Sequence, residues 1–136
     1  MLWILTDLLQ ESLAISGTDV LEVVPAIAPS PIAGCTSPWQ GVIRYRGHIV
    51  PVMDLCERLG IPSPPPSMRQ RILIMKPYNK MQVALKVPSA RALSDEEIRA
   101  AQDSTQAIMI RRLPRDEIFA EAYYRIAESM LKGIRL

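Results

Sequence analysis

Few side chains in this sequence have the type and spacing that catalysis needs. His48 is the only histidine, and no nucleophile or orienting carboxylate is spaced around it, so a surface position is a better interpretation than a general base. Asp95, Glu96 and Glu97 resemble paired carboxylates, but at the start of a predicted helix they complement the helix dipole. Glycine-rich phosphate loops, the zinc motif HExxH and the nucleophile motif GxSxG are absent. We therefore predict a protein that is not an enzyme.

The two cysteines do not predict a metal site. Cys35 and Cys56 form no CxxC pair, and His48 is the only histidine that could join them. A zinc site needs about four nitrogen or sulfur ligands, or three and a water molecule. We expect two reduced thiols, no metal and no cofactor.

The basic residues give weak support for nucleic-acid binding. The formal net charge is +2, whereas a nucleic-acid binder concentrates its basic residues in one field. The run RRLPR at 111–115 lacks interleaved aromatic residues on which bases would stack. The scattered residues Arg44, Arg46, Arg69 and Arg71 leave a small nucleic-acid-binding β-barrel module as the alternative function.

Length and composition indicate one domain with an aliphatic core. The chain has 136 residues, of which 49% are hydrophobic and 5% are aromatic. No run of about 18 apolar residues is present, so no membrane insertion is expected. The first residues, MLWILTDLLQE, lack a basic segment and reach Asp7 too early for a signal peptide. We expect a cytoplasmic protein.

The elements that must position these residues are mostly short strands divided by proline-rich segments. Strands are expected at 2–6, 12–15, 41–46, 48–53, 71–75, 81–87 and 106–110. The stretches 25–39 and 61–69 are expected to form an irregular loop and a polyproline-like connector. Asp54 is expected to cap a short helix that ends at Gly60. This pattern is typical of small β-barrels.

The last third of the chain changes character. Ser94 and Glu97 have capping-box spacing, so residues 95–103 are expected to be helical. The whole segment 89–103 is expected to be helical and not stranded. A longer helix is predicted over 115–133, with Asp116 as its N-cap candidate. Two rows at helical spacing form a broad apolar stripe on this helix: Ile118, Ala122, Ile126 and Met130, and Phe119, Tyr123, Ala127 and Leu131.

The segment GVIRYRGHIVPVMDLCERLG at 41–60 closely resembles the signature of the CheW-like domain, the coupling module of bacterial chemotaxis arrays. Upstream, LAISGTDVLEVVP at 13–25 resembles the family's second strand and the Val-x-Glu segment after it. The resemblance covers about residues 1–60 and extends more loosely to QRILIM at 70–75. It implies a mainly β fold of two small SH3-like five-stranded β-barrels that share a core, without catalysis. It also implies an adaptor between the cytoplasmic helical tip of a chemoreceptor and the regulatory domain of a CheA-type histidine kinase.

The resemblance further implies which residues meet a partner. They are Val20, Glu22, Val23, Gly41, Arg46 and Gly47. Most of them would lie at a receptor groove between the barrels, and Gly41 would be a point where the backbone comes close to a partner. Gly47 supplies the turn, and Arg46 offers a planar set of donors for a polar group on a partner helix. The alternative is that Arg46 pairs with Glu22 and merely ties two segments together.

We expect a single CheW-like domain over 1–136, with a first barrel at roughly 1–60, a second part at roughly 68–113 and a C-terminal helix at roughly 115–132. Pro88 and the helical segment after it depart from the strands that the family usually has, so the second barrel is expected to be abridged. The C-terminal helix would dock on the open side of that barrel and replace the missing strands. The alternative cover is a helix from the kinase or from another copy, which would mean self-association through the C-terminal helix.

Overall fold

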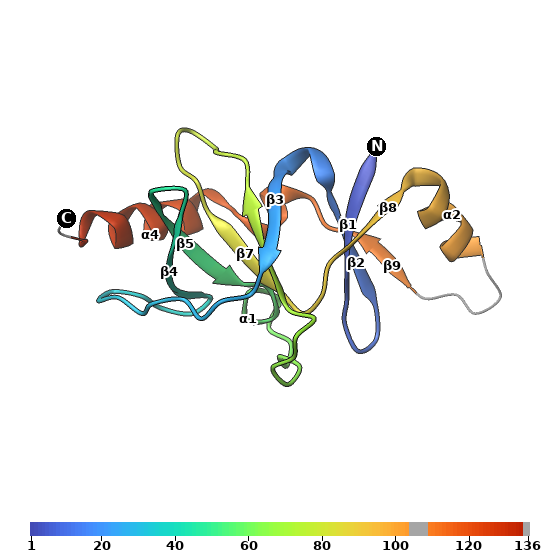
Figure 1. Ribbon diagram of the computed structural model, residues 1–136, viewed down its shortest axis with the longest axis horizontal. Coiled ribbons are helices and arrows are strands. Elements are labelled where there is room, and N and C mark those ends of the chain that lie inside the picture. Colours follow the sequence, from blue (N-terminus) through green and yellow to red (C-terminus); the bar gives the residue numbers. More distant parts are fainter. Residues whose placement is uncertain (104–108, 135–136) are drawn as a thin grey trace.

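The structure is a computed structural model that describes residues 1–103 and 109–134, and in these residues it has two β-sheets (Figure 1). The first elements are β1 (Leu2–Asp7), β2 (Ser12–Ser16), η1 (Gly17–Asp19), β3 (Val20–Pro25), β4 (Trp39–Tyr45), β5 (His48–Asp54) and α1 (Leu55–Leu59). They are followed by β6 (Arg71–Met75), β7 (Ala84–Val87), β8 (Arg91–Ser94), α2 (Asp95–Asp103), β9 (Ile110–Arg112), α3 (Arg115–Ile118) and α4 (Glu121–Lys132). The mainly β fold with helical C-terminal elements is as predicted.

The larger sheet has the strand order β3-β6-β7-β5-β4 and curls toward a barrel. Its inner face carries one apolar cluster: Ile43, Val50, Val52, Ile72, Ile74 and Ala84. Val24 of the edge strand β3 and Tyr45 of the opposite edge strand β4 both pack against this cluster. The two edges therefore face each other across the same group of side chains, which is the geometry of a small barrel.

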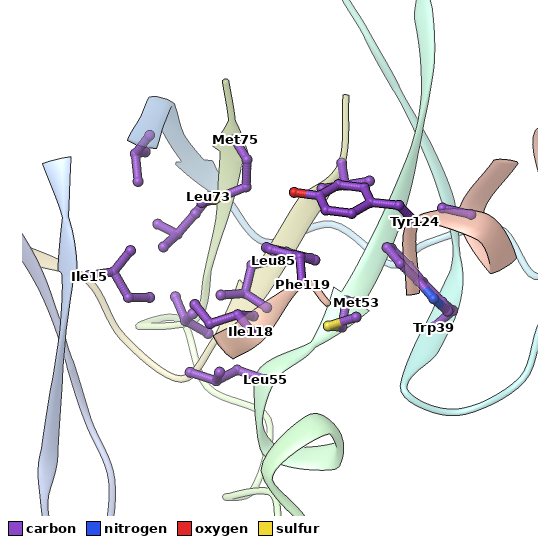
Figure 2. Packing of buried hydrophobic residues seen from close by; sticks show 14 of the residues in the cluster. Ile15, Trp39, Met53, Leu55, Leu73, Met75, Leu85, Ile118, Phe119 and Tyr124 are labelled. Carbon is purple, nitrogen blue, oxygen red and sulfur yellow. The ribbon is translucent and has the colours of Figure 1, made fainter. Parts of the chain in front are cut away.

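The outer face of the larger sheet is also apolar, because it forms the core shared with the rest of the chain. Leu73 and Met75 of β6 and Leu85 of β7 are fully buried in a cluster with Leu13 and Ile15 of β2. Figure 2 shows Ile118 and Phe119 from the C-terminal segment in the same cluster, beside Leu85 and Met53. The predicted shared core is present, and strands with two buried faces account for the continuous apolar runs in the sequence.

The smaller sheet has the order β8-β1-β2-β9 and takes its strands from both ends of the chain. Each of the two parts expected at 1–60 and 68–113 therefore contributes strands to both sheets. Ile98 of α2 is fully buried against Leu5 of β1 and Ala14 of β2. The smaller sheet has four strands, whereas the larger one has five. α2 covers the apolar side chains on one face of the smaller sheet.

Several local expectations are confirmed. β4 and β5 form the predicted hairpin, with Tyr45 opposite His48 at its end. The carboxylate of Asp54 accepts a hydrogen bond of 2.9 Å from the amide of Glu57, and Gly60 ends α1 with φ 69°. β6 and β7 form the second antiparallel pair, although β7 begins at Ala84 and not at residue 81.

The expectation for residues 89–103 was wrong at its start. Arg91–Ser94 is the strand β8, because these residues pair with β1 along its outer edge. The capping box itself is present: Ser94 Oγ accepts from the amide of Glu97, and a carboxylate oxygen of Glu97 accepts from the amide of Ser94. It therefore marks the start of α2 immediately after a strand. Of the strand expected at 106–110, residues 106–108 lie outside the described residues, and Ile110 begins β9.

The single helix expected over 115–133 is broken, and this prediction was also wrong. α3 ends at Ile118, Phe119 and Ala120 have non-helical backbone, and α4 begins at Glu121. The residue that precedes α3 is Pro114, so Asp116 lies in the first turn and is not the N-cap. Of the predicted apolar stripe, Ile118, Phe119, Ala127 and Met130 are buried, whereas Ala122 is exposed. Tyr124, which was outside the predicted rows, is buried as well.

The C-terminal helices do not take the place of strands in the smaller sheet. α4 lies against β5 of the larger sheet, at the end of the molecule opposite α2 (Figure 1). Phe119 and Tyr124 pack on each other, with ring centroids 5.8 Å apart, and Phe119 also lies near Trp39. In the described part of the chain, no helix is long and apolar enough to cross a membrane.

Candidate partner-binding site

The two edges of the larger sheet meet at a small polar cluster formed by Glu22, Tyr45 and Arg46. The guanidinium of Arg46 lies 3.3 Å from Oε2 of Glu22, and the hydroxyl of Tyr45 donates a hydrogen bond to the same oxygen. Glu22 comes from β3, whereas Tyr45 ends β4 and Arg46 begins the turn that follows. The fold therefore brings together two segments that the sequence separates by the proline-rich loop.

Arg46 has a backbone conformation that non-glycine residues rarely adopt. Its φ is 46° and that of Gly47 is 79°, and the pair Tyr45–His48 closes this two-residue turn. Turns with positive φ at both central residues favour Asn-Gly, and an ordinary L-residue there costs about 1–2 kcal/mol. A strained non-glycine residue at an exposed turn motivates a hypothesis of function.

The side chain of Arg46 is held from two sides but remains accessible. Its guanidinium carbon lies 5.3 Å from the centre of the Tyr45 ring, which is within the range of a cation–π interaction. Its side chain is nevertheless 72% exposed. The pair with Glu22 is the contact of the alternative in which Arg46 only ties two segments together, and an exposed ion pair of this kind contributes about 0–1 kcal/mol.

The hydroxyl of Tyr45 is a donor in this cluster. Its hydrogen bond to Glu22 is the main reason that the pKa of Tyr45 is raised, with burial adding to the shift. The bond stabilises the protonated phenol beside the carboxylate. The phenol thus holds its proton, and Glu22 carries the acceptor oxygen that Tyr45 and Arg46 share.

The other residues of the predicted set divide into exposed and buried ones. Val23 is 38% exposed on β3, and Gly47 is exposed at the tip of the turn. Val20 is 9% exposed and belongs to the shared core. Leu21 and Ile27, which lie close in sequence to Val23, are also exposed. The accessible part of the predicted set is thus Glu22, Val23, Arg46 and Gly47.

The close backbone approach expected at Gly41 is made to another segment of this chain. It is buried with φ 141°, and a Cβ added there would lie 2.2 Å from the carbonyl oxygen of Ser30. Ser30 and Val42 exchange two main-chain hydrogen bonds of 2.8 and 2.9 Å beside it. The glycine lets the proline-rich loop lie directly on β4.

Sequence reasoning missed Tyr45. The alternation along β4 puts Ile43 and Tyr45 on the face that packs on the inner cluster, and this period of two was visible in the sequence. The acceptor of the Tyr45 hydroxyl was not visible, because Glu22 reaches it only when the sheet curls.

The residues that the sequence offered for chemistry lie apart from one another. His48 is exposed beside the turn. Cys35 packs against the shared core and Cys56 is buried, and burial is the main cause of the raised pKa of each thiol. Among the described residues, no group of three or more His, Cys, Asp or Glu side chains lies in an arrangement that would hold a metal ion. What the cluster offers is an exposed guanidinium that Glu22 and Tyr45 both contact.

Comparison with known proteins agrees with this reading of the fold. Residues 3–113 match the CheW-like domain. The crystal structure of scaffolding protein TtCheW from Thermoanaerobacter tengcongensis is similar, with a TM-score of 0.60 and 29% sequence identity. The similarity covers 66% of this chain and 61% of that chain, so this chain spans about three-fifths of TtCheW. No curated protein sequence matches.

The family match includes every strand described above and stops before α3 and α4. It therefore includes the whole of the Glu22–Tyr45–Arg46 cluster, whereas the C-terminal helices lie outside the matched part. The predicted resemblance is confirmed over 111 residues (3 to 113), which is most of the chain. The chain belongs to the CheW-like domain family.

Proposed function

We propose that this protein is a non-catalytic adaptor in the cytoplasm that couples the helical tip of a methyl-accepting chemoreceptor to the regulatory domain of a CheA-type histidine kinase. Membership of the CheW-like domain family supports an adaptor role, and the similar protein TtCheW is described as a scaffolding protein. The observation that carries the proposal is the exposed guanidinium of Arg46, held in a strained turn and paired with Glu22 of the opposite edge strand of the larger sheet.

The chemistry of this surface suits an amphipathic partner helix. Leu21 and Val23 present apolar side chains on β3, and Arg46, which pairs with Glu22 of the same strand, presents a planar donor group. A helix laid on such a surface would bury apolar residues on one side and offer a carbonyl, amide or carboxylate to the guanidinium. The receptor tip is helical, so we assign this surface to the receptor.

The contacts of the arginines favour the adaptor over the nucleic-acid alternative. Of the four arginines on which it depended, Arg46 pairs with Glu22 and Arg69 with Asp7. Arg71 donates to the carbonyl oxygens of Met68 and Gln70. Arg44 is exposed. Contacts within the chain thus occupy three of the four side chains on which a nucleic-acid interface would depend.

Reconstitution with purified components tests the proposal. A CheA-type kinase is mixed with a receptor cytoplasmic fragment, and autophosphorylation is followed with and without this protein. We expect stimulation only when the receptor fragment, the kinase and this protein are all present, and Arg46→Ala should abolish it with little change in melting temperature. Full stimulation without receptor would show that the bridging model is wrong.

A further inference from the structure

Tyr45 occupies a place between the core of the larger sheet and the exposed cluster. Its ring packs against the inner apolar cluster of that sheet, and its hydroxyl reaches the carboxylate of Glu22. The same ring lies 5.3 Å from the guanidinium carbon of Arg46. One side chain therefore contacts both members of the ion pair, and it is itself held by packing on the barrel interior.

The ion pair by itself is too exposed to hold its own geometry. The side chains of Arg46 and Glu22 are 72% and 39% exposed, and they are 3.3 Å apart. Water competes for such pairs, and long side chains lose rotamer freedom when they form them. An additional contact from a packed ring and a directed hydroxyl removes part of that freedom before any partner arrives.

From these contacts we propose that Tyr45 is the positioning residue of the partner surface: it holds Glu22 and Arg46 in the arrangement that the partner meets, without touching the partner itself. The proposal rests on the proposed function for the nature of the partner, a receptor helix. Its structural half, that Tyr45 orders the guanidinium of Arg46, concerns the free protein alone. The raised pKa of Tyr45 agrees with it, because the phenol keeps the proton that it donates to Glu22.

The variant Tyr45→Phe separates the hydroxyl from the ring. Phenylalanine keeps the packing on the inner cluster and the ring under Arg46, and it removes only the hydrogen bond to Glu22. Preorganisation of one or two long side chains corresponds to roughly a three- to tenfold change in affinity. We therefore expect Tyr45→Phe to weaken binding to a receptor cytoplasmic fragment roughly three- to tenfold, and Arg46→Ala to weaken it more. Tyr123→Phe, which removes a hydroxyl from α4, is the matched control and should bind as the wild type does.

Two further measurements distinguish positioning from a general structural role. In the free protein, ¹⁵N relaxation of the Arg46 Nε–H group should report larger-amplitude motion in Tyr45→Phe than in wild type, with an unchanged melting temperature. In a double-mutant cycle, Tyr45→Phe combined with Glu22→Gln should bind no more weakly than the poorer single variant, since both act through one contact.

Each failure has a distinct meaning. Unchanged Arg46 motion in Tyr45→Phe, or additive losses in the cycle, would overturn the positioning role. Wild-type affinity in Tyr45→Phe together with lost binding in Arg46→Ala would also overturn it while leaving the proposed function intact. Wild-type protein that binds no receptor fragment would overturn the proposed function and the partner half of this inference, and the relaxation measurement would still decide the structural half.

Discussion

The indole of Trp3 donates a hydrogen bond of 2.6 Å to Oδ1 of Asp95, and this bond joins the first strand to the start of α2 across 92 residues of sequence. The guanidinium carbon of Arg112 lies over the Trp3 ring, 5.2 Å from its centre. β1, α2 and β9 are therefore linked by one aromatic side chain of the smaller sheet.

The hydrogen bond from Trp3 is the main reason that the pKa of Asp95 is lowered from its ordinary value of 3.8. The folded state therefore holds this proton less tightly than the unfolded chain does. The stabilisation is present above the unfolded value and is lost as the pH falls through the folded value. In Trp3→Phe, an NMR titration should give Asp95 a pKa closer to 3.8, and the difference in stability from wild type should shrink on acidification. The same pKa in both proteins would contradict this.

Gly41 and Gly47 form a matched pair for a test of backbone space. Both have positive φ, but a Cβ at Gly41 would lie 2.2 Å from the carbonyl oxygen of Ser30, whereas a Cβ at Gly47 meets nothing within 4 Å. Urea denaturation should show Gly47→Ala losing about 1–2 kcal/mol from its φ alone, and Gly41→Ala losing about 2–4 kcal/mol. Equal losses of unfolding free energy in the two variants would mean that the proline-rich loop moves to accommodate the added methyl group.

Replacement of Arg46 by asparagine should separate stability from function. Asn-Gly is the preferred sequence for this turn, so Arg46→Asn should relieve backbone strain while it removes an exposed ion pair of small value. We expect unfolding free energy equal to the wild type or up to about 1 kcal/mol higher, together with lost receptor binding. A stability loss that matches the loss of binding would favour the alternative in which Arg46 only ties β3 to the hairpin.

Arg58 holds the break between α3 and α4. Its Nε donates to the carbonyl oxygen of Ile118 at 3.0 Å and a terminal nitrogen donates to that of Glu117 at 2.7 Å. The guanidinium carbon also lies 4.6 Å from the centre of the Tyr123 ring. Arg58→Ala should cost about 1.5–3 kcal/mol in urea denaturation, because charged hydrogen bonds to otherwise terminal carbonyls are lost. Arg125→Ala, which breaks an exposed pair with Glu121, is the control and should change stability by less than about 1 kcal/mol.

Truncation after Leu113 should destroy the shared core. It removes Ile118 and Phe119, which are buried against both sheets, and Tyr124, Ala127 and Met130 with them. Each large apolar side chain contributes roughly 1.5–3 kcal/mol on burial, so the truncated protein should aggregate or melt far lower. Phe119→Ala should lose about 3–5 kcal/mol in the full chain. A soluble, monomeric truncation with an unchanged melting temperature would contradict the burial of these helices.

Local signals in the sequence predicted the local structure well. The Arg46-Gly47 turn and the Asp54 cap each depend on a few neighbouring residues, and both are found where expected. The capping box at Ser94 was recognised, but the strand that ends there was not, because β8 exists only through its pairing with β1.

What escaped prediction depends on contacts between distant residues. The apolar rows continue in helical register through Phe119 and Ala120, and no proline or glycine marks the break there. The break is held by Arg58, which lies 60 residues away from Ile118 in the sequence. For the same reason the Tyr45–Glu22 contact and the Gly41–Ser30 approach were invisible, since each requires the curled sheet.

The strands of the larger sheet lie in the sequence between the two pairs of strands that form the smaller sheet, and this order matters during translation. The larger sheet is built from β3 to β7, an unbroken stretch from Val20 to Val87, whereas the smaller sheet joins β1 and β2 to β8 and β9. β1 and β2 are synthesised first, and their partners β8 and β9 are synthesised last. The larger sheet can therefore form during translation before the smaller sheet is complete. Until Ile98 emerges, Leu5 and Ala14 have no helix to cover them. A translational pause before α2 would therefore expose an apolar hairpin with open edges, and the nascent chain would depend on chaperones at that stage.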